Sequence, residues 1–404
     1  MGCAYSATIP DASFSSAWRE SLSDLTGKVV AITGCTSGTG FVAAMECRKR
    51  GAKVILLNRA SGRAQAALAA LLNEGSKEAD DWRTSRVGHG PIPAGSGGVG
   101  SNSSPVTPDL TSAAEKAKAE HVDCDLMSLD SIRAAAEKVL AIVGEGGLDV
   151  LCLNAGINFG KGDTKDGYEM VMQVNHMSHM LLLSLLYPSL EAASTQREEA
   201  RVVFHTSMAR MVVGMPKLMK EIMKDKTEGA TKTIPSCAFA KAPREWPEEV
   251  KMFAKDDVVG TYGLSKACNF VCWAALHEKL LAKGSKVKSL IAHPGTAATD
   301  IFAKRFGKTF MTCIGNCMVR SSAHSDADGA CPLLTCICGS GVTSGEFYAP
   351  KGSDQMLGYE SQTKGPPEKV VLADWERKVM TQGAVVWADT YAALGVEFDI
   401  LPAI

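Results

Sequence analysis

The feature that most constrains the fold is a short apolar run followed by a glycine-rich turn and a helical segment. Residues 28–33 are predicted to form a buried parallel strand, residues 34–40 the turn, and residues 41–50 a helix. In this order the turn presents backbone N–H groups and a helix N-terminus to a pyrophosphate. The glycines at 34, 38 and 40 depart from the G-x-G-x-x-G spacing. The strand–turn–helix context nevertheless favours a dinucleotide site.

The second predicted strand, residues 53–57, ends at Asn58-Arg59. An acidic residue near this strand end would bind the ribose hydroxyls of NAD, whereas a basic residue accommodates the 2′-phosphate of NADP. Arg59 has no acid beside it, so the sequence predicts NADP. The alternative is that Arg59 is an ordinary surface arginine.

Strands and helices continue to alternate along the chain. Further strands are predicted at 121–126, 148–153, 201–207, 287–292 and 345–349, and helices at 131–143, 168–187, 262–282, 327–338 and 372–394. Asn154-Ala155-Gly156 follows one strand, where a small residue and a glycine let a flat ligand approach the backbone. Ser207 places a hydroxyl at another strand end, the edge at which ligands collect in open parallel sheets.

Composition limits the remaining possibilities. The chain has 404 residues, 46% of them hydrophobic, and a net charge of −1, which gives no basic field for nucleic acid. Thirteen cysteines without a framework spacing indicate reduced thiols and a cytoplasmic location. No uninterrupted run of 18 apolar residues occurs, so a spanning helix is not expected. Cysteines 313, 317, 331, 336 and 338, with His324, lack the C-x-x-C spacing of a zinc site, and no metal is predicted.

Two segments interrupt the alternation. Residues 73–120 contain a Gly-, Ser- and Pro-rich stretch that cannot bury enough apolar surface to order itself, which predicts a flexible surface insertion. Residues 208–258 begin with a Met- and Lys-rich stretch and are interpreted as a lid-like insertion. The catalytic domain is placed at 26–350, after a tail at 1–25 and before a helical extension at 351–404.

The first six residues, Met1 to Ser6, fit the N-myristoylation pattern at Gly2, and Cys3 could take a palmitoyl chain. Two acyl chains anchor a protein stably where one does not. The hypothesis is peripheral membrane attachment through Gly2 and Cys3. The alternative is a disordered tail that matches a loose pattern by accident.

Tyr262 and Lys266 stand four residues apart, one helical turn, on the same face of a predicted helix. An ammonium near a phenol oxygen favours the phenolate, which brings the tyrosine closer to the range useful for proton transfer. Asn175 lies in a mostly apolar helix, where an asparagine is unfavourable and, if buried, needs partners.

Together these segments resemble the short-chain dehydrogenase/reductase family, in its retinol-dehydrogenase-like and light-dependent protochlorophyllide-reductase-like branches. The resemblance covers most of residues 26–350. It is carried by Thr33 to Gly40, Asp125-Leu126, Asn154-Ala155-Gly156, Asn175, Ser207, Tyr262 to Lys266, and Pro294-Gly295. It implies a single Rossmann-type α/β domain, in which a doubly wound parallel sheet has helices on both faces.

The resemblance also implies roles for individual residues. The expected catalytic set is Asn175, Ser207, Tyr262 and Lys266. The expected cofactor-binding set is Gly34, Ser37, Gly38, Thr39, Gly40, Arg59, Asp125, Leu126, Asn154, Ala155, Gly156, Tyr262, Lys266, Pro294, Gly295 and Thr296.

These roles predict an NADPH-dependent oxidoreductase that acts on a bulky apolar carbonyl or alcohol, with Tyr262 as proton donor. The first alternative is a light-dependent protochlorophyllide reductase-like enzyme, because Cys268 follows Lys266 by two residues and 55 positions separate Ser207 from Tyr262. The second alternative is a catalytically idle NADP-binding scaffold or sensor.

Overall fold

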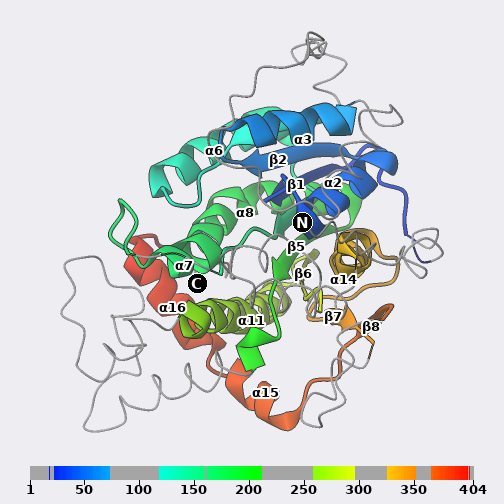
Figure 1. The fold of residues 1–404 in the computed structure, drawn as a ribbon. Helices are drawn as coiled ribbons and strands as arrows, with labels where there is room; N and C mark the ends of the chain where they lie inside the picture. Colours follow the sequence, from blue (N-terminus) through cyan, green and yellow to red (C-terminus); the bar gives the residue numbers. More distant parts are fainter. Residues whose placement is uncertain are drawn as a thin grey trace, which may run out of the picture.

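The computed structural model describes residues 18, 22–72, 118–158, 160, 162–211, 258–295, 325–351, 365–398 and 400. An eight-stranded sheet runs through the molecule in the order β3-β2-β1-β4-β5-β6-β7-β8 (Figure 1). Its strands are β1 (Val29–Thr33), β2 (Lys53–Asn58), β3 (Ala119–Asp123), β4 (Val150–Leu153), β5 (Ala200–His205), β6 (Val287–Ala292), β7 (Phe347–Pro350) and β8 (Pro367–Lys369). All neighbouring pairs are parallel except β7 and β8, which pair antiparallel.

Helices cover both faces of this sheet (Figure 1). One face carries α6 (Leu129–Val143), α7 (Met170–Met172), η2 (Gln173–Met177), α8 (Ser178–Arg197), α11 (Val258–Lys283) and α16 (Gly383–Leu394). The other face carries α2 (Gly38–Lys49), α3 (Gly62–Leu72) and α14 (Asp326–Cys338). The predicted doubly wound parallel sheet with helices on both faces is therefore confirmed.

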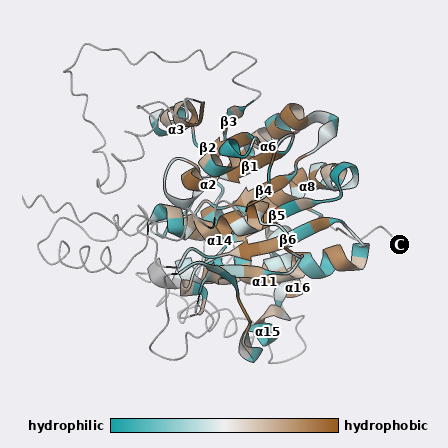
Figure 2. Cartoon of the chain, turned by 90° about the vertical axis from the view of Figure 1, so that its right-hand side faces the viewer, coloured by the Kyte–Doolittle hydropathy of each residue, from teal (hydrophilic) through white to brown (hydrophobic). Residues whose placement is uncertain are grey.

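The strands are apolar nearly throughout because both of their faces are buried. Figure 2 shows hydrophobic strands enclosed between the helices. Along β1, Ala31 faces one core, while Val30 and Ile32 face the other. This alternation follows from the two-residue period of a strand, and each side chain loses its contact with water.

Several elements differ from the sequence-based prediction. Helix α8 continues past Pro188 to Arg197, although proline removes a hydrogen bond from a helix. Beyond the proline, Leu190 and Ala193 are fully buried, and burying a leucine side chain contributes about 2 kcal/mol, which offsets much of the cost. Strand β3 begins two residues and ends three residues earlier than expected.

The C-terminal segment also differs in detail. The single helix predicted at 372–394 is two helices, α15 (Asp374–Met380) and α16, separated at residues 381–382. The segment also adds the edge strand β8 to the sheet. Helix α3 and strand β8 are elements that the sequence did not reveal.

Other predictions fall on residues outside the described set. These are the acylation site at Gly2 and Cys3, most of the predicted insertions 73–120 and 208–258 (residues 73–117 and 212–257), Thr296, and residues 313, 317 and 324. The structure does not test these predictions. The end of the first predicted insertion is wrong, because Ala119 and Glu120 belong to strand β3.

Candidate active site

The site lies at the carboxyl ends of the parallel strands, beside the point where the strand order reverses between β1 and β4. The glycine turn follows β1 here, with Gly34 at a φ of 74°. A Cβ at Gly40 would lie 2.3 Å from Nδ2 of Asn154 and 2.4 Å from the Gly34 carbonyl oxygen. Only glycine fits at position 40, so the turn keeps its backbone open to a ligand.

The side chain of Asn154, at the end of β4, holds the turn in place. Its Nδ2 donates to the carbonyl oxygens of Thr33 at 2.9 Å and Gly34 at 3.4 Å. Its Oδ1 accepts from Thr39 at 3.2 Å and lies 2.9 Å from Nδ1 of His205 on β5. The next residue, Ala155, donates its N–H to the Thr33 hydroxyl at 3.0 Å. Asn154 therefore joins β1, α2 and β5.

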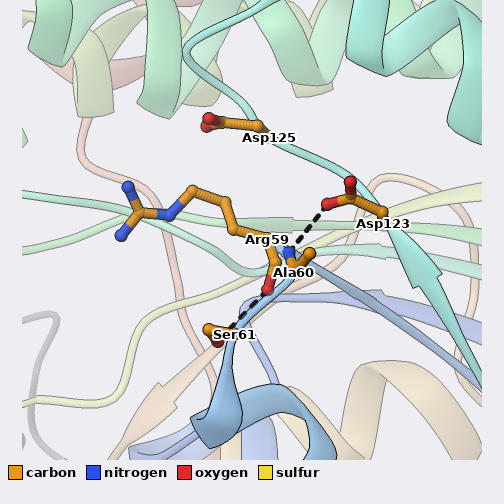
Figure 3. A pocket seen from close by; sticks show the side chains of 5 residues that line it. All are labelled: Arg59, Ala60, Ser61, Asp123 and Asp125. Atoms are coloured by element: carbon orange, nitrogen blue, oxygen red, sulfur yellow. Dashed lines mark hydrogen bonds between the residues drawn. The ribbon is translucent and has the colours of Figure 1, made fainter.

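A cavity of about 430 Å³ opens at the ends of β2 and β3. It is lined by Arg59, Ala60, Ser61, Asp123 and Asp125. Asp123 accepts the Ala60 N–H at 2.8 Å, and Figure 3 shows the Arg59 side chain extending away from Asp123. No described residue forms an ion pair with Arg59, so its guanidinium can meet an anion here.

Asn58, next to Arg59, has a structural role that the sequence did not reveal. It is 5% exposed, and its Oδ1 accepts the Cys35 N–H of the glycine turn at 2.7 Å. The side chain that ends β2 thus orders the turn that follows β1.

Arg63 on α3 is a second basic residue that the sequence analysis missed. Its Nη2 donates to Oγ of Ser37 at 3.2 Å. Ser37 is the N-cap residue of α2 and makes no side-chain cap hydrogen bond. Arg59 thus places a positive charge at the 430 Å³ cavity, and Arg63 places another at the glycine turn. The sequence contains one signal for this pair, the four-residue spacing of Arg59 and Arg63. That spacing indicates a shared site only when residues 62–72 are known to form helix α3.

Two residues predicted to bind the cofactor, Asp125 and Leu126, form hydrogen bonds within the protein. Asp125 accepts the Met127 N–H at 3.0 Å, and its carboxylate also borders the cavity. The Leu126 side chain is 8% exposed, and its carbonyl oxygen accepts from Ser178 at 2.7 Å. At the end of β6, Pro294 precedes Gly295, which has a φ of 66°.

Ser207, in the turn after β5, and Tyr262, on α11, are brought together. A side-chain hydrogen bond joins them and lowers the pKa of the phenol, whereas burial raises that pKa by a larger amount. The net pKa of Tyr262 lies above its ordinary value. The prediction that Lys266 brings the tyrosine pKa down is therefore wrong, because burial outweighs the effects that lower it.

Lys266 lies one turn further along α11. Its side chain is 3% exposed, and its Nζ donates to the His205 carbonyl oxygen at 3.1 Å. Nζ lies 5.8 Å from the centre of the Tyr262 ring. Burial lowers the pKa of Lys266 to about 8, because an ammonium is poorly solvated in the interior.

Asn175 lies in the π-helical segment η2, a distortion that often accompanies functional sites. Its Oδ1 accepts the Ile157 N–H and its Nδ2 donates to the Ile157 carbonyl oxygen, both at 2.8 Å. Nδ2 also contacts Oγ of Ser265 at 3.0 Å. A Cβ at Gly156 would lie 3.3 Å from both Asn175 Oδ1 and Lys266 Nζ. Asn175 and Lys266 thus border the same space beside Gly156.

A buried polar chain behind this space was not predicted. Asn269 donates to the carbonyl oxygens of Asn175 at 3.0 Å and His205 at 3.4 Å. Its Oδ1 lies 2.9 Å from Nδ1 of His176, whose Nε2 lies 2.9 Å from the Thr390 hydroxyl. Because the Asn269 amide donates to two carbonyls, its Oδ1 must accept, so we assign the proton to Nδ1 of His176. Burial lowers the pKa of His176 to about 4 and keeps it neutral.

The described residues contain no group of three or more His, Cys, Asp or Glu side chains that could hold a metal ion. Cys331, Cys336 and Cys338 lie buried on α14. Among the described helices, none combines the length and the hydropathy that a membrane crossing requires.

Comparison with known proteins finds similarity to short-chain dehydrogenases. The family model described as short chain dehydrogenase matches residues 101–218. An uncharacterised oxidoreductase of Schizosaccharomyces pombe is 27% identical over 293 residues, which is 71% of this chain and 65% of that protein. Human retinol dehydrogenase 14 is 36% identical over 172 residues, 42% of this chain and 43% of that protein. The matches thus span 65% or less of these relatives.

Among solved structures, that of an uncharacterised protein from Mycobacterium paratuberculosis aligns with a TM-score of 0.56 at 22% identity, covering 94% of this chain and 98% of that one. This similarity supports the fold. The strand order and the glycine turn after β1 define a Rossmann-type α/β fold. Over the residues that the family model and these relatives match, the chain is similar to the short-chain dehydrogenase/reductase family.

Proposed function

We propose that the protein transfers hydride between NADP(H) and a bulky apolar carbonyl or alcohol, with Tyr262 as the proton donor. The observation that carries the proposal is the hydrogen bond between Ser207 and Tyr262, with Lys266 one turn away on α11. Two hydroxyls from different elements then converge on one place where a carbonyl oxygen can bind.

The nucleotide end of the site fits a dinucleotide phosphate. The glycine turn leaves no room for a side chain at position 40, and the Ser37 N-cap opens helix α2 toward an anion. Arg59 lines the adjacent cavity and Arg63 contacts Ser37, so two cations can meet a 2′-phosphate and a pyrophosphate. When bound, the nicotinamide supplies or accepts the hydride.

Side chains of the protein carry out the proton transfer. In reduction, Ser207 holds the carbonyl oxygen and Tyr262 donates its proton to that oxygen. A positive charge on Lys266 stabilises the phenolate that remains, because Nζ lies 5.8 Å from the centre of the Tyr262 ring. Asn175 borders the same space and keeps η2 in place through its bonds to Ile157.

The apolar substrate class rests on the resemblance to retinol dehydrogenases and on human retinol dehydrogenase 14 among the relatives. A panel assay tests it. Purified protein is mixed with NADPH or NADH and with retinal, long-chain aldehydes, a steroid ketone and short polar aldehydes, and cofactor oxidation is followed. We expect NADPH-dependent turnover that increases with the apolar size of the substrate. Turnover confined to polar aldehydes would refute the substrate class, and NADPH binding without any turnover would favour an idle scaffold.

A further inference from the structure

We propose that the buried ion pair between Arg210 and Glu376 positions Ser207. Helix α15 of the C-terminal segment, which carries Glu376, therefore supports the active site. The inference rests on the proposed function, in which Ser207 holds the substrate oxygen. Arg210 and Glu376 are positioning residues, because neither is placed in contact with substrate or cofactor.

The first observation is the place of Arg210 in the chain. It lies three residues after Ser207, in the turn that follows β5. Its backbone N–H donates to the Ser207 carbonyl oxygen at 3.0 Å, and Nη1 approaches the same oxygen at 3.4 Å. The arginine thus contacts the backbone of the residue whose hydroxyl bonds to Tyr262. A shift of the guanidinium would be transmitted to that hydroxyl through a single turn.

The second observation is how the guanidinium is held. Nη2 donates to Oε1 of Glu376 at 2.9 Å, and the two side chains are only 2% and 4% exposed. The guanidinium carbon lies 5.0 Å from the ring centre of Phe270 on α11 and 4.7 Å from that of Phe347 on β7. Contacts with two rings and a carboxylate leave the group little freedom.

The third observation is that the carboxylate of Glu376 is itself held by a second hydrogen bond. Its second oxygen, Oε2, accepts the Ala373 N–H at 3.0 Å at the start of α15. Both carboxylate oxygens therefore have a partner, and the carboxylate cannot follow Arg210 if the Ser207 turn moves. The link spans 166 positions in the sequence and joins β5 to the C-terminal segment.

Stability alone does not account for such a pair. Replacing a buried ion pair by apolar residues of similar volume is often neutral or stabilising, because burial of the charges is costly. The pair stands beside the turn that carries Ser207, where directional bonds set the position of a hydroxyl more narrowly than apolar packing does.

The test separates positioning from folding with two variants. Arg210→Met combined with Glu376→Gln removes both charges, and glutamine keeps an acceptor for the Ala373 N–H. Arg210→Lys keeps an ion pair with Glu376, but one ammonium cannot also reproduce the second guanidinium contact with Ser207. Arg197→Met is the matched control, because Arg197 pairs with the buried Asp149 at the other end of the strands, 2.5 Å away.

Three quantities are measured for each protein: the melting temperature, the NADPH dissociation constant, and kcat and KM for the best carbonyl substrate. We expect the double variant to lose at least about tenfold in kcat, with an NADPH dissociation constant within about twofold of wild type. Arg210→Lys should show a smaller loss of the same kind. The control should keep its kcat. A folded double variant with wild-type kcat overturns the inference.

A readout without turnover distinguishes this inference from the proposed function. The apparent pKa of Tyr262 is measured by NMR with ¹³C-labelled tyrosine, with Tyr262→Phe used to assign the signal. Because the bond from Ser207 lowers this pKa, Ser207→Ala should raise it. The double variant should raise it by a similar amount, and adding Ser207→Ala should change it little further. If wild type turns over no carbonyl but the titration behaves this way, only the proposed function fails. If the double variant folds and its Tyr262 pKa equals that of wild type, the positioning role is refuted. If the double variant does not fold, the same comparison is made with Arg210→Lys, and an unchanged Tyr262 pKa there refutes the role.

Discussion

The side-chain amide of Asn154 donates to the carbonyl oxygen of Thr33 at 2.9 Å, which ties the end of β4 to the end of β1 where the strand order reverses. The same Nδ2 lies 2.3 Å from the position that a Cβ at Gly40 would take. The amide therefore sets the shape of the glycine turn and leaves no space for a side chain on it.

Gly40→Ala should weaken cofactor binding, because the new methyl group would lie 2.3 Å from Asn154 Nδ2 and 2.4 Å from the Gly34 oxygen. We expect the NADPH dissociation constant to rise by at least about tenfold, that is, about 1.4 kcal/mol. Gly62→Ala is the matched control, since a Cβ there meets no atom within 4 Å. Fluorescence titration with NADPH measures both. Equal affinities in the two variants would contradict the prediction.

Tyr262→Phe should keep cofactor binding and lose reduction, because only the proton donor is removed. Loss of a general acid costs about 10²- to 10⁴-fold in rate. Steady-state kcat and the NADPH dissociation constant are measured on the same preparation. Wild-type turnover in this variant would refute the role of Tyr262 as proton donor.

Arg59→Asp should shift the preference from NADPH toward NADH, because it places a negative charge in the cavity expected to take the 2′-phosphate. The measurement is the ratio of the two dissociation constants. Arg377→Asp is the control, since that side chain is 58% exposed on α15. If both variants leave the ratio unchanged, Arg59 is an ordinary surface residue.

Lys266 should make the unfolding free energy depend on pH in the alkaline range. Burial lowers its pKa from 10.5 to about 8, so between these values the unfolded chain binds more protons than the folded one. This contribution to stability therefore rises with pH from about 8 to about 10.5, by at most about 3 kcal/mol.

Lys266→Met should lack this rise, whereas Lys286→Met, at a lysine whose side chain is 50% exposed, should retain it. Urea unfolding of the ligand-free proteins at a series of pH values gives the three curves. Parallel curves for wild type and Lys266→Met would show that the lysine is not held in a poorly solvated position.

If the proposed function holds, the protein should reduce a carbonyl substrate in darkness. The Ser207–Tyr262 hydrogen bond and the nearby Lys266 supply the groups for a thermal proton transfer. The protein is incubated with NADPH and protochlorophyllide, in darkness and under illumination, and in parallel with retinal and long-chain aldehydes. Light-gated conversion of the pigment, without dark activity on any aldehyde or ketone, would reverse the proposal.

The sequence by itself determined the features that are local in the chain. The apolar run, the glycine turn and the helix after it are contiguous, so β1 and α2 could be predicted from the pattern of residues 28–50 alone. Buried strands of a parallel sheet are apolar on both faces, which made most of the other strands recognisable as well. The sequence also named Ser207, Tyr262 and Lys266 as candidates, because each follows a strand or begins a helix in a familiar order.

Only the tertiary structure decided which distant groups meet. Arg210 and Glu376, 166 positions apart, carry no periodicity that relates one to the other. The same holds for His176 and Thr390, and for strand β8, which pairs with β7 although its own sequence is not apolar. These contacts depend on how the C-terminal segment packs against the sheet and α11. Such packing is a property of the assembled fold, because no local propensity encodes a hydrogen bond between elements far apart in the chain.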